Sequence, residues 1–158
     1  MSGAALLSRL RRGEVVVADG AWGTMLIAEA GLPPGAPPER VTLEFPDLVE
    51  GLARRYAEAG AEVLTTNTFG GTPLRLAAHG LEGRCEELNR RAVELARAAA
   101  GARAAVAGSV GPTGLLLAPL GTAAPGAVED AFARQIAALA AAGADLLCVE
   151  TMTDVEEA

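Results

Sequence analysis

Residues 143–151 read GADLLCVET, and this short stretch contains the pattern that decides the fold. A glycine ends a helical segment, a run of apolar residues follows, and the run closes on the carboxylate of Glu150. An apolar run without alternation is typical of a parallel strand that is buried on both faces. A glycine just past a helix is a common stop signal. The stretch therefore predicts a helix that leads into a buried parallel strand with a polar end.

The same unit is found three more times upstream. The ranges predicted as strands recur at intervals of about 40 residues, longer than a bare βα unit, and are Val15–Asp19, Glu62–Phe69, Ala104–Val110 and Asp145–Thr151. Helices are predicted between them at Leu48–Ala59, Glu86–Ala100 and Val128–Ala142, each followed by a glycine. This alternation predicts an α/β fold with right-handed crossovers. The longest predicted loop, Trp22 to about Pro46, holds most of the prolines and is either a lid or an exposed connector.

Two architectures accommodate four such units: a small doubly wound sheet, or half of a (βα)8 TIM barrel. Ligand groups gather at a switch point in the first, whereas every strand end faces one mouth in the second. All four predicted strands end in polar residues, which favours the first four βα units of a TIM barrel. The chain closes on a helix-start pattern, T-x-x-E at Thr153 and Glu156. We therefore expect residues 1–158 to be a truncated, N-terminal half-barrel with two open strand edges, and Val15, Val17, Leu64 and Cys148 to line its inner face.

Composition and charge exclude several classes of protein. Half of the residues are apolar (51%), so the chain is not disordered, and a net charge of −7 argues against nucleic-acid binding. All thirteen basic residues are arginines, which excludes a Schiff-base lysine. No stretch is apolar enough to predict a membrane span. Two distant cysteines indicate a reduced, cytoplasmic setting.

Two carboxylates at predicted strand ends are the main candidates for a site. Asp19 either caps the turn that follows it or binds a ligand beside the small residues of GAWGT. Glu150 closes an apolar strand, where a carboxylate is costly unless it is bonded or lies at a cavity. With no Lys or His nearby in sequence, the pair suits binding of an ammonium group, and a glycosidase-like acid/base pair is the other possibility. Alternation places Thr66 and Thr68 on one face of their strand, and Cys148 on the same side as Glu150.

Four segments together carry a resemblance to a known family. They are DGAWGTML, EVLTTNTFGGTPLRLAAHGLE, VAGSVGPTG and ADLLCVETMTDVEEA, and their order and spacing resemble the opening half of the homocysteine S-methyltransferases. Among these, the N-terminal homocysteine-binding module of cobalamin-dependent methionine synthase is most similar. The resemblance implies a (βα)8 barrel that binds homocysteine and methylates its zinc-activated thiolate in methionine biosynthesis. It further implies that Asp19 and Glu150 hold the substrate ammonium, that Gly20 lies near its carboxylate, and that Thr66 contacts the amino acid.

The same resemblance leaves the catalytic metal outside this sequence. The family's zinc ligands are three cysteines, two of them adjacent, and no Cys-Cys pair occurs here. We therefore expect zinc ligands only beyond residue 158, no catalytic residue within it, and an inactive isolated fragment that requires the remaining half of the barrel. Cobalamin and methyltetrahydrofolate acting through other modules, betaine, and S-methylmethionine all stay open as methyl donors. Two alternatives are a small non-catalytic α/β module that binds an amine or amino acid, and a structural half that requires a complementary chain.

Overall fold

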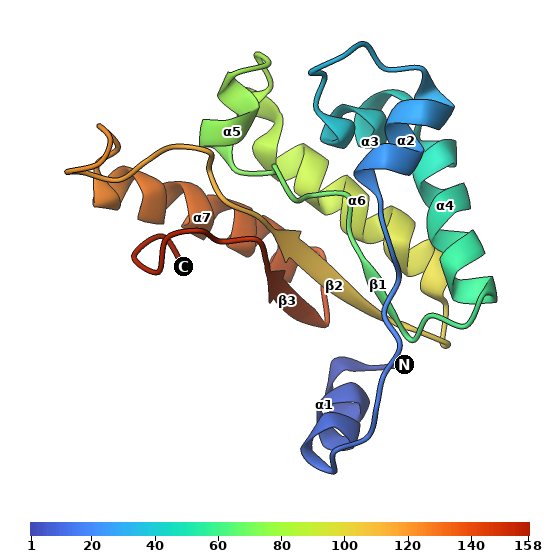
Figure 1. Ribbon diagram of the computed structural model, residues 1–158. Coiled ribbons are helices and arrows are strands. Elements are labelled where there is room, and N and C mark those ends of the chain that lie inside the picture. Colours follow the sequence, from blue (N-terminus) through green and yellow to red (C-terminus); the bar gives the residue numbers. More distant parts are fainter.

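The computed structural model describes all residues from 1 to 158. Figure 1 shows three strands with helices packed along them and one helix standing apart near the amino ends of the strands. The elements in chain order are α1 (Gly3–Arg11), α2 (Gly23–Ala30), η1 (Pro38–Arg40), α3 (Val41–Glu44), α4 (Pro46–Glu58), β1 (Val63–Thr65), α5 (Pro73–Ala77), η2 (Glu82–Arg84), α6 (Cys85–Ala100), β2 (Ala105–Val110), α7 (Pro125–Ala141) and β3 (Leu146–Val149).

The strands form one parallel sheet in the order β1-β2-β3, which confirms the predicted α/β class. The predicted first strand, Val15–Asp19, is wrong as a regular strand. This segment is extended and makes only one isolated bridge, between Ala18 and Val63. Val15 and Val17 have no strand packed beside them on the far side, and their exposed fractions are therefore 85% and 56%. The segment is therefore an edge held by few bonds, among them the amide of Asp19 to the carbonyl of Val63 at 3.0 Å.

The three long helices α4, α6 and α7 pack against one face of this sheet. The main apolar core contains Leu64, Val106 and Val110 from the strands, packed against alanines and Val93 of α4 and α6 and against Leu139 of α7. Leu64 is thus buried under the helices, so its predicted place on the opposite face is wrong. Because parallel partners in register share a face, Ser109 and its partner Cys148 lie on the opposite, helix-free face. That face carries the candidate site.

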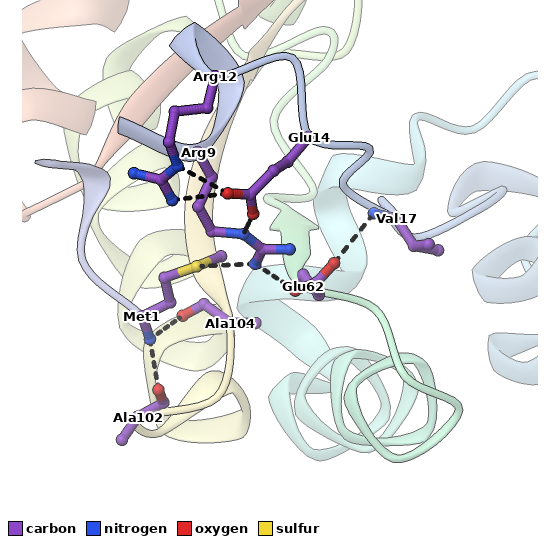
Figure 2. A network of polar contacts seen from close by, with 8 residues as sticks. All are labelled: Met1, Arg9, Arg12, Glu14, Val17, Glu62, Ala102 and Ala104. Carbon is purple, nitrogen blue, oxygen red and sulfur yellow. Dashed lines mark hydrogen bonds and ion pairs between the residues drawn. The ribbon is translucent and has the colours of Figure 1, made fainter. Parts of the chain in front are cut away.

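A polar network at the amino end of the sheet fastens α1 to it (Figure 2). The guanidinium of Arg9 donates to Glu14 at 2.9 Å and also to Glu62, just before β1. Glu62 in turn accepts from the amide of Val17 at 3.4 Å. The ammonium of Met1 donates to the backbone carbonyls at residues 102 and 104, just before β2. The network thereby positions the edge segment that leads to Asp19.

Asp145 forms a second fastening at the start of β3. Its carboxylate accepts from the amide of Val106 at 2.9 Å, from Arg97 at 2.6 Å and from the amide of Gly3 at 3.1 Å. Burial opposes ionisation of this carboxyl, but the hydrogen bonds from Val106, Arg97 and Gly3 outweigh it and lower its pKa. Gly3 is required here, since a Cβ at that position would lie 2.6 Å from the carbonyl oxygen of Asp145.

The predicted helices are confirmed within three residues at every end, but two further predictions of local structure are wrong. The predicted long loop contains α2, η1 and α3, because Leu26 and Val41 pack with Val49 of α4 into a second apolar cluster. The predicted helix start at Thr153 is a turn, in which the amide of residue 156 donates to the carboxylate of Asp154 at 3.0 Å. None of the helices is long and apolar enough to cross a membrane.

Candidate ligand site beside the carboxyl ends of the strands

A cavity of about 720 Å³ opens at the carboxyl ends of the strands, where the helix-free face of the sheet meets residues of α2, η1 and α5. Its lining combines segments that are far apart in the sequence. The four residues predicted as substrate-binding all line it, and so do Ser109 and Cys148; the four are Asp19, Gly20, Thr66 and Glu150. The fold thus brings the predicted residues together around a single space. Their individual contacts determine what this space can bind.

Asp19 is held by three donor groups. Its Oδ2 accepts from the amide of Thr65 at 2.7 Å and from the indole Nε1 of Trp22 at 2.8 Å. The hydroxyl of Thr65 lies 3.1 Å from both carboxylate oxygens. Burial nevertheless raises the pKa of Asp19, against the lowering effect of these donors. The carboxylate is therefore held in a fixed position and has no cationic partner. A cation bound beside it would stabilise its charged form.

Glu150 faces the same cavity from the opposite edge of the sheet. The hydroxyl of Ser109 on β2 donates to its Oε1 at 2.5 Å, and no arginine pairs with it. The following residue, Thr151, has a φ of 61°, which is rare for a β-branched side chain. Strained backbone of this kind persists only where the surroundings enforce it, and it is frequent at functional sites. The turn after β3 therefore fixes where the Glu150 carboxylate emerges.

Thr66 has one hydrogen-bonding position left for a ligand. Its hydroxyl lies 2.6 Å from that of Thr68, which confirms that these two side chains share a face. Thr68 donates its own proton to the carbonyl of Ser109 at 2.7 Å, so Thr66 must be the donor between the two hydroxyls. Thr66 also accepts from the amide of Ser109 at 3.1 Å. One lone pair stays free, so Thr66 can accept a hydrogen bond from a ligand but cannot donate one.

Gly20 is enclosed by an aromatic side chain. A Cβ at this position would lie 3.2 Å from the hydroxyl oxygen of Tyr56, which donates to the carbonyl of Ala21 at 2.7 Å. The ring of Tyr56 is also tilted against that of Trp22, with centroids 6.2 Å apart. The absence of a side chain at Gly20 thus allows Tyr56 to lock the loop that carries Asp19.

Three further residues of the cavity were missed by sequence reasoning. Trp22 supplies the indole donor to Asp19, Glu39 adds a buried carboxylate, and Arg75 brings a positive charge. Oε1 of Glu39 accepts from the amide of Gly70 at 2.6 Å. Only Trp22 had a signal in the sequence, because it lies three residues after Asp19. Glu39 was hidden in the Pro-rich stretch, and Arg75 resembles any helical arginine.

The two cysteines have different surroundings. Cys148 lines the cavity beside Glu150, as predicted, and burial raises its pKa, with further contributions from the charges of Glu150 and Asp19. Cys85 is fully buried elsewhere, where burial raises its pKa to about 11, and its thiol donates to the carbonyl of Gly71 at 3.2 Å. No group of three or more His, Cys, Asp or Glu side chains is arranged to hold a metal ion. The residues present therefore do not fit a zinc site.

Comparison with known proteins identifies the family. A sequence profile of the homocysteine S-methyltransferases matches residues 16–158. The chain belongs to that family. The homocysteine S-methyltransferase of Escherichia coli K12 is 36% identical over 170 residues, which cover 96% of this chain and 54% of that protein. The methionine synthase of Mycobacterium leprae is 34% identical over 152 residues, which cover 89% of this chain and 12% of the synthase.

A solved homocysteine S-methyltransferase has the same fold. The crystal structure of MmuM from Escherichia coli in its metallated form matches with a TM-score of 0.82 at 32% identity, and the match covers 96% of this chain and 59% of that one. The resemblance inferred from the four motifs is therefore confirmed. This member of the family spans about half the length of the Escherichia coli enzyme that it matches.

Proposed function

We propose that this chain binds L-homocysteine as the acceptor in an S-methyl transfer that yields methionine, and that Asp19 and Glu150 hold the substrate ammonium. One observation carries the proposal: two carboxylates on opposite edges of the sheet line one cavity, and neither has a cationic partner. An ammonium group has three donors and no acceptor. Asp19, Glu150 and the free lone pair of Thr66 are three acceptors that match it. Backbone amides after Gly20 are the proposed partners of the substrate carboxylate.

The same surroundings would not activate the substrate thiol. A free thiol has a pKa near ~8.5 and is mostly protonated at neutral pH. Cys148 reports what this cavity does to a thiol, because burial and the charges of Glu150 and Asp19 raise its pKa further. A homocysteine thiol buried beside the same two carboxylates would have its pKa shifted in the same direction. In this proposal the segment therefore binds and orients homocysteine, and the positive charge that forms the thiolate comes from residues outside this sequence.

The arrangement of the helices favours the barrel over the doubly wound alternative. A doubly wound sheet has helices on both faces, whereas a (βα)8 barrel has all of them outside and its ligand at the carboxyl ends of the strands. Here α4, α6 and α7 cover one face only, and the cavity opens on the other. We therefore propose that the sheet belongs to the N-terminal half of such a barrel, with the remaining half as its partner.

A titration tests the proposed ligand. Trp22 is the only tryptophan and donates to Asp19, so its fluorescence reports on the cavity. We expect L-homocysteine and the carboxyl-free 3-aminopropanethiol to change this signal at saturable concentrations. The amine-free 4-mercaptobutyrate should bind at least tenfold more weakly, because it offers no ammonium to the two carboxylates. Equal binding of 4-mercaptobutyrate and homocysteine would refute the ammonium site. Equal binding of homocysteine and simple alkylamines would instead favour a general amine-binding module.

A further inference from the structure

Arg75 is an unusual arginine for this protein. Of the thirteen arginines only Arg11, Arg75 and Arg103 form no ion pair. Arg11 and Arg103 are exposed on the surface, where water satisfies them. Arg75 is half-buried and lines the cavity, and the only hydrogen bond of its guanidinium is a long one, 3.5 Å to the carbonyl of Pro112. A guanidinium with five donors is thus left almost unused beside a ligand space.

The surroundings of Arg75 keep its guanidinium in place without neutralising it. The group lies over the ring of Phe69, with 5.7 Å between Cζ and the ring centroid. Gly70 and Gly114 leave the space that it occupies, since a Cβ at either would come within about 3 Å of Arg75 atoms. The cavity carboxylate of Glu39 accepts from the amide of Gly70 and forms no ion pair with Arg75. The positive charge is therefore available to an anion.

The position of Arg75 separates it from the ammonium site. Asp19 and Glu150 bond to residues within the strands, Thr65 and Ser109. Arg75, in contrast, contacts Phe69 and Pro112, which lie in the loops after β1 and β2. The ammonium and carboxylate of an amino acid share one carbon atom, so a homocysteine held at the strand ends keeps its carboxylate there too. The guanidinium in the loop layer is left for a second ligand.

We infer that Arg75 is the anion-binding residue for the second substrate, the molecule that brings the methyl group, and that it takes an oxyanion of that molecule. This inference rests on the proposed function, because it assumes that homocysteine occupies the strand-end layer. The oxyanion is either a carboxylate of a small methyl donor or a phosphate of a larger cofactor, and both match the planar fork of a guanidinium.

Calorimetric titration with two probes tests the inference and separates the two sources. Glutarate represents a carboxylate and inorganic phosphate a phosphate, and each is titrated with and without saturating L-homocysteine. The variants are Arg75→Gln, Arg75→Lys and the matched control Arg103→Gln, which removes an unpaired arginine far from the cavity lining. Near-UV circular dichroism of each variant confirms that the fold is intact.

We expect at least one probe to bind the wild-type chain with homocysteine present, and the tighter probe to identify the source. Arg75→Gln should weaken that probe about tenfold or more, Arg75→Lys less, and Arg103→Gln not at all. Homocysteine affinity should be unchanged in Arg75→Gln. The inference is overturned if neither probe binds, if Arg75→Gln binds it like wild type, or if homocysteine weakens in parallel. If homocysteine does not bind while probe binding still depends on Arg75, the proposed function fails and the anion site stands.

Discussion

Replacing Asp19 by Asn should separate ligand binding from folding. An Asn amide oxygen can take the place of Oδ2 and keep the bonds from the Thr65 amide and Trp22, while its NH₂ group donates to the Thr65 hydroxyl. The variant therefore loses a charge but no internal hydrogen bond. Burial raises the pKa of Asp19, so the folded protein favours the uncharged form. The free energy of unfolding should be unchanged or slightly higher in the Asn variant.

Homocysteine affinity should fall in the same variant. Losing one carboxylate of a buried charge pair costs ~2–5 kcal/mol, and the lower figure applies because Glu150 still faces the ammonium. This predicts a dissociation constant about 30-fold higher. In the wild type, affinity should also fall as the pH drops through the raised pKa of Asp19, above the ordinary value of 3.8. That part of the pH dependence should be absent from the variant.

Fluorescence of Trp22 measures the affinity and thermal unfolding measures the stability of each protein. Asp130→Asn is the control, because Asp130 is exposed on α7 and does not line the cavity. Normal homocysteine affinity in Asp19→Asn would refute the ammonium assignment. A loss of affinity that accompanies an equal loss of stability would show that Asp19 acts only on the fold.

Three further predictions concern neighbouring groups. Ser109→Ala should raise the dissociation constant of homocysteine about fivefold, as measured by the same titration, because Glu150 loses the hydroxyl that orients it. Iodoacetamide at neutral pH should alkylate Cys148 slowly, and more slowly with homocysteine bound. Cys85, whose pKa is raised to about 11, should react only after unfolding. Mass spectrometry of the digested protein distinguishes the two cysteines. Asp145→Asn should lower the free energy of unfolding by ~2 kcal/mol at neutral pH in urea titrations. Since the pKa of Asp145 is lowered in the fold, this difference should shrink as the pH falls below its ordinary value of 3.8, and a constant difference would contradict the argument.

The sequence predicted the elements whose pattern is set locally. The helices α4, α6 and α7 carry apolar residues at helical spacing and end at glycines, so their ranges were predictable. The edge segment before Asp19 was not predictable, because its apolar residues resemble those of a buried strand. Val15 is exposed because no neighbouring element covers it, which the local sequence does not reveal. The short helix α2 was missed because its stability comes from tertiary packing and not from its local pattern. It is stabilised by packing of Leu26 against α4, which no local pattern reveals.

The candidate site was predictable where a polar residue interrupts an apolar run. Asp19, Thr66 and Glu150 all violate the strand pattern, and the structure places all three around one cavity. Glu39 and Arg75 violate no pattern, since charged residues are ordinary in loops and on helices. Their significance depends on which residues surround them, and some of those contacts join distant segments, as in the bond from Gly70 to Glu39, which are 31 positions apart.

The two carboxylates lie on the two outermost segments of the sheet, with β1 and β2 between them. All six residues of β2 are buried, and the strand pairs with β1 on one side and with β3 on the other, so its amides should be among the last to exchange with deuterium. The segment before Asp19 has only a few backbone bonds and should open often and locally. A ligand that contacts both Asp19 and Glu150 would connect the two outermost segments of the sheet. Homocysteine should therefore slow exchange most at residues 17–19, where the unliganded chain is least protected.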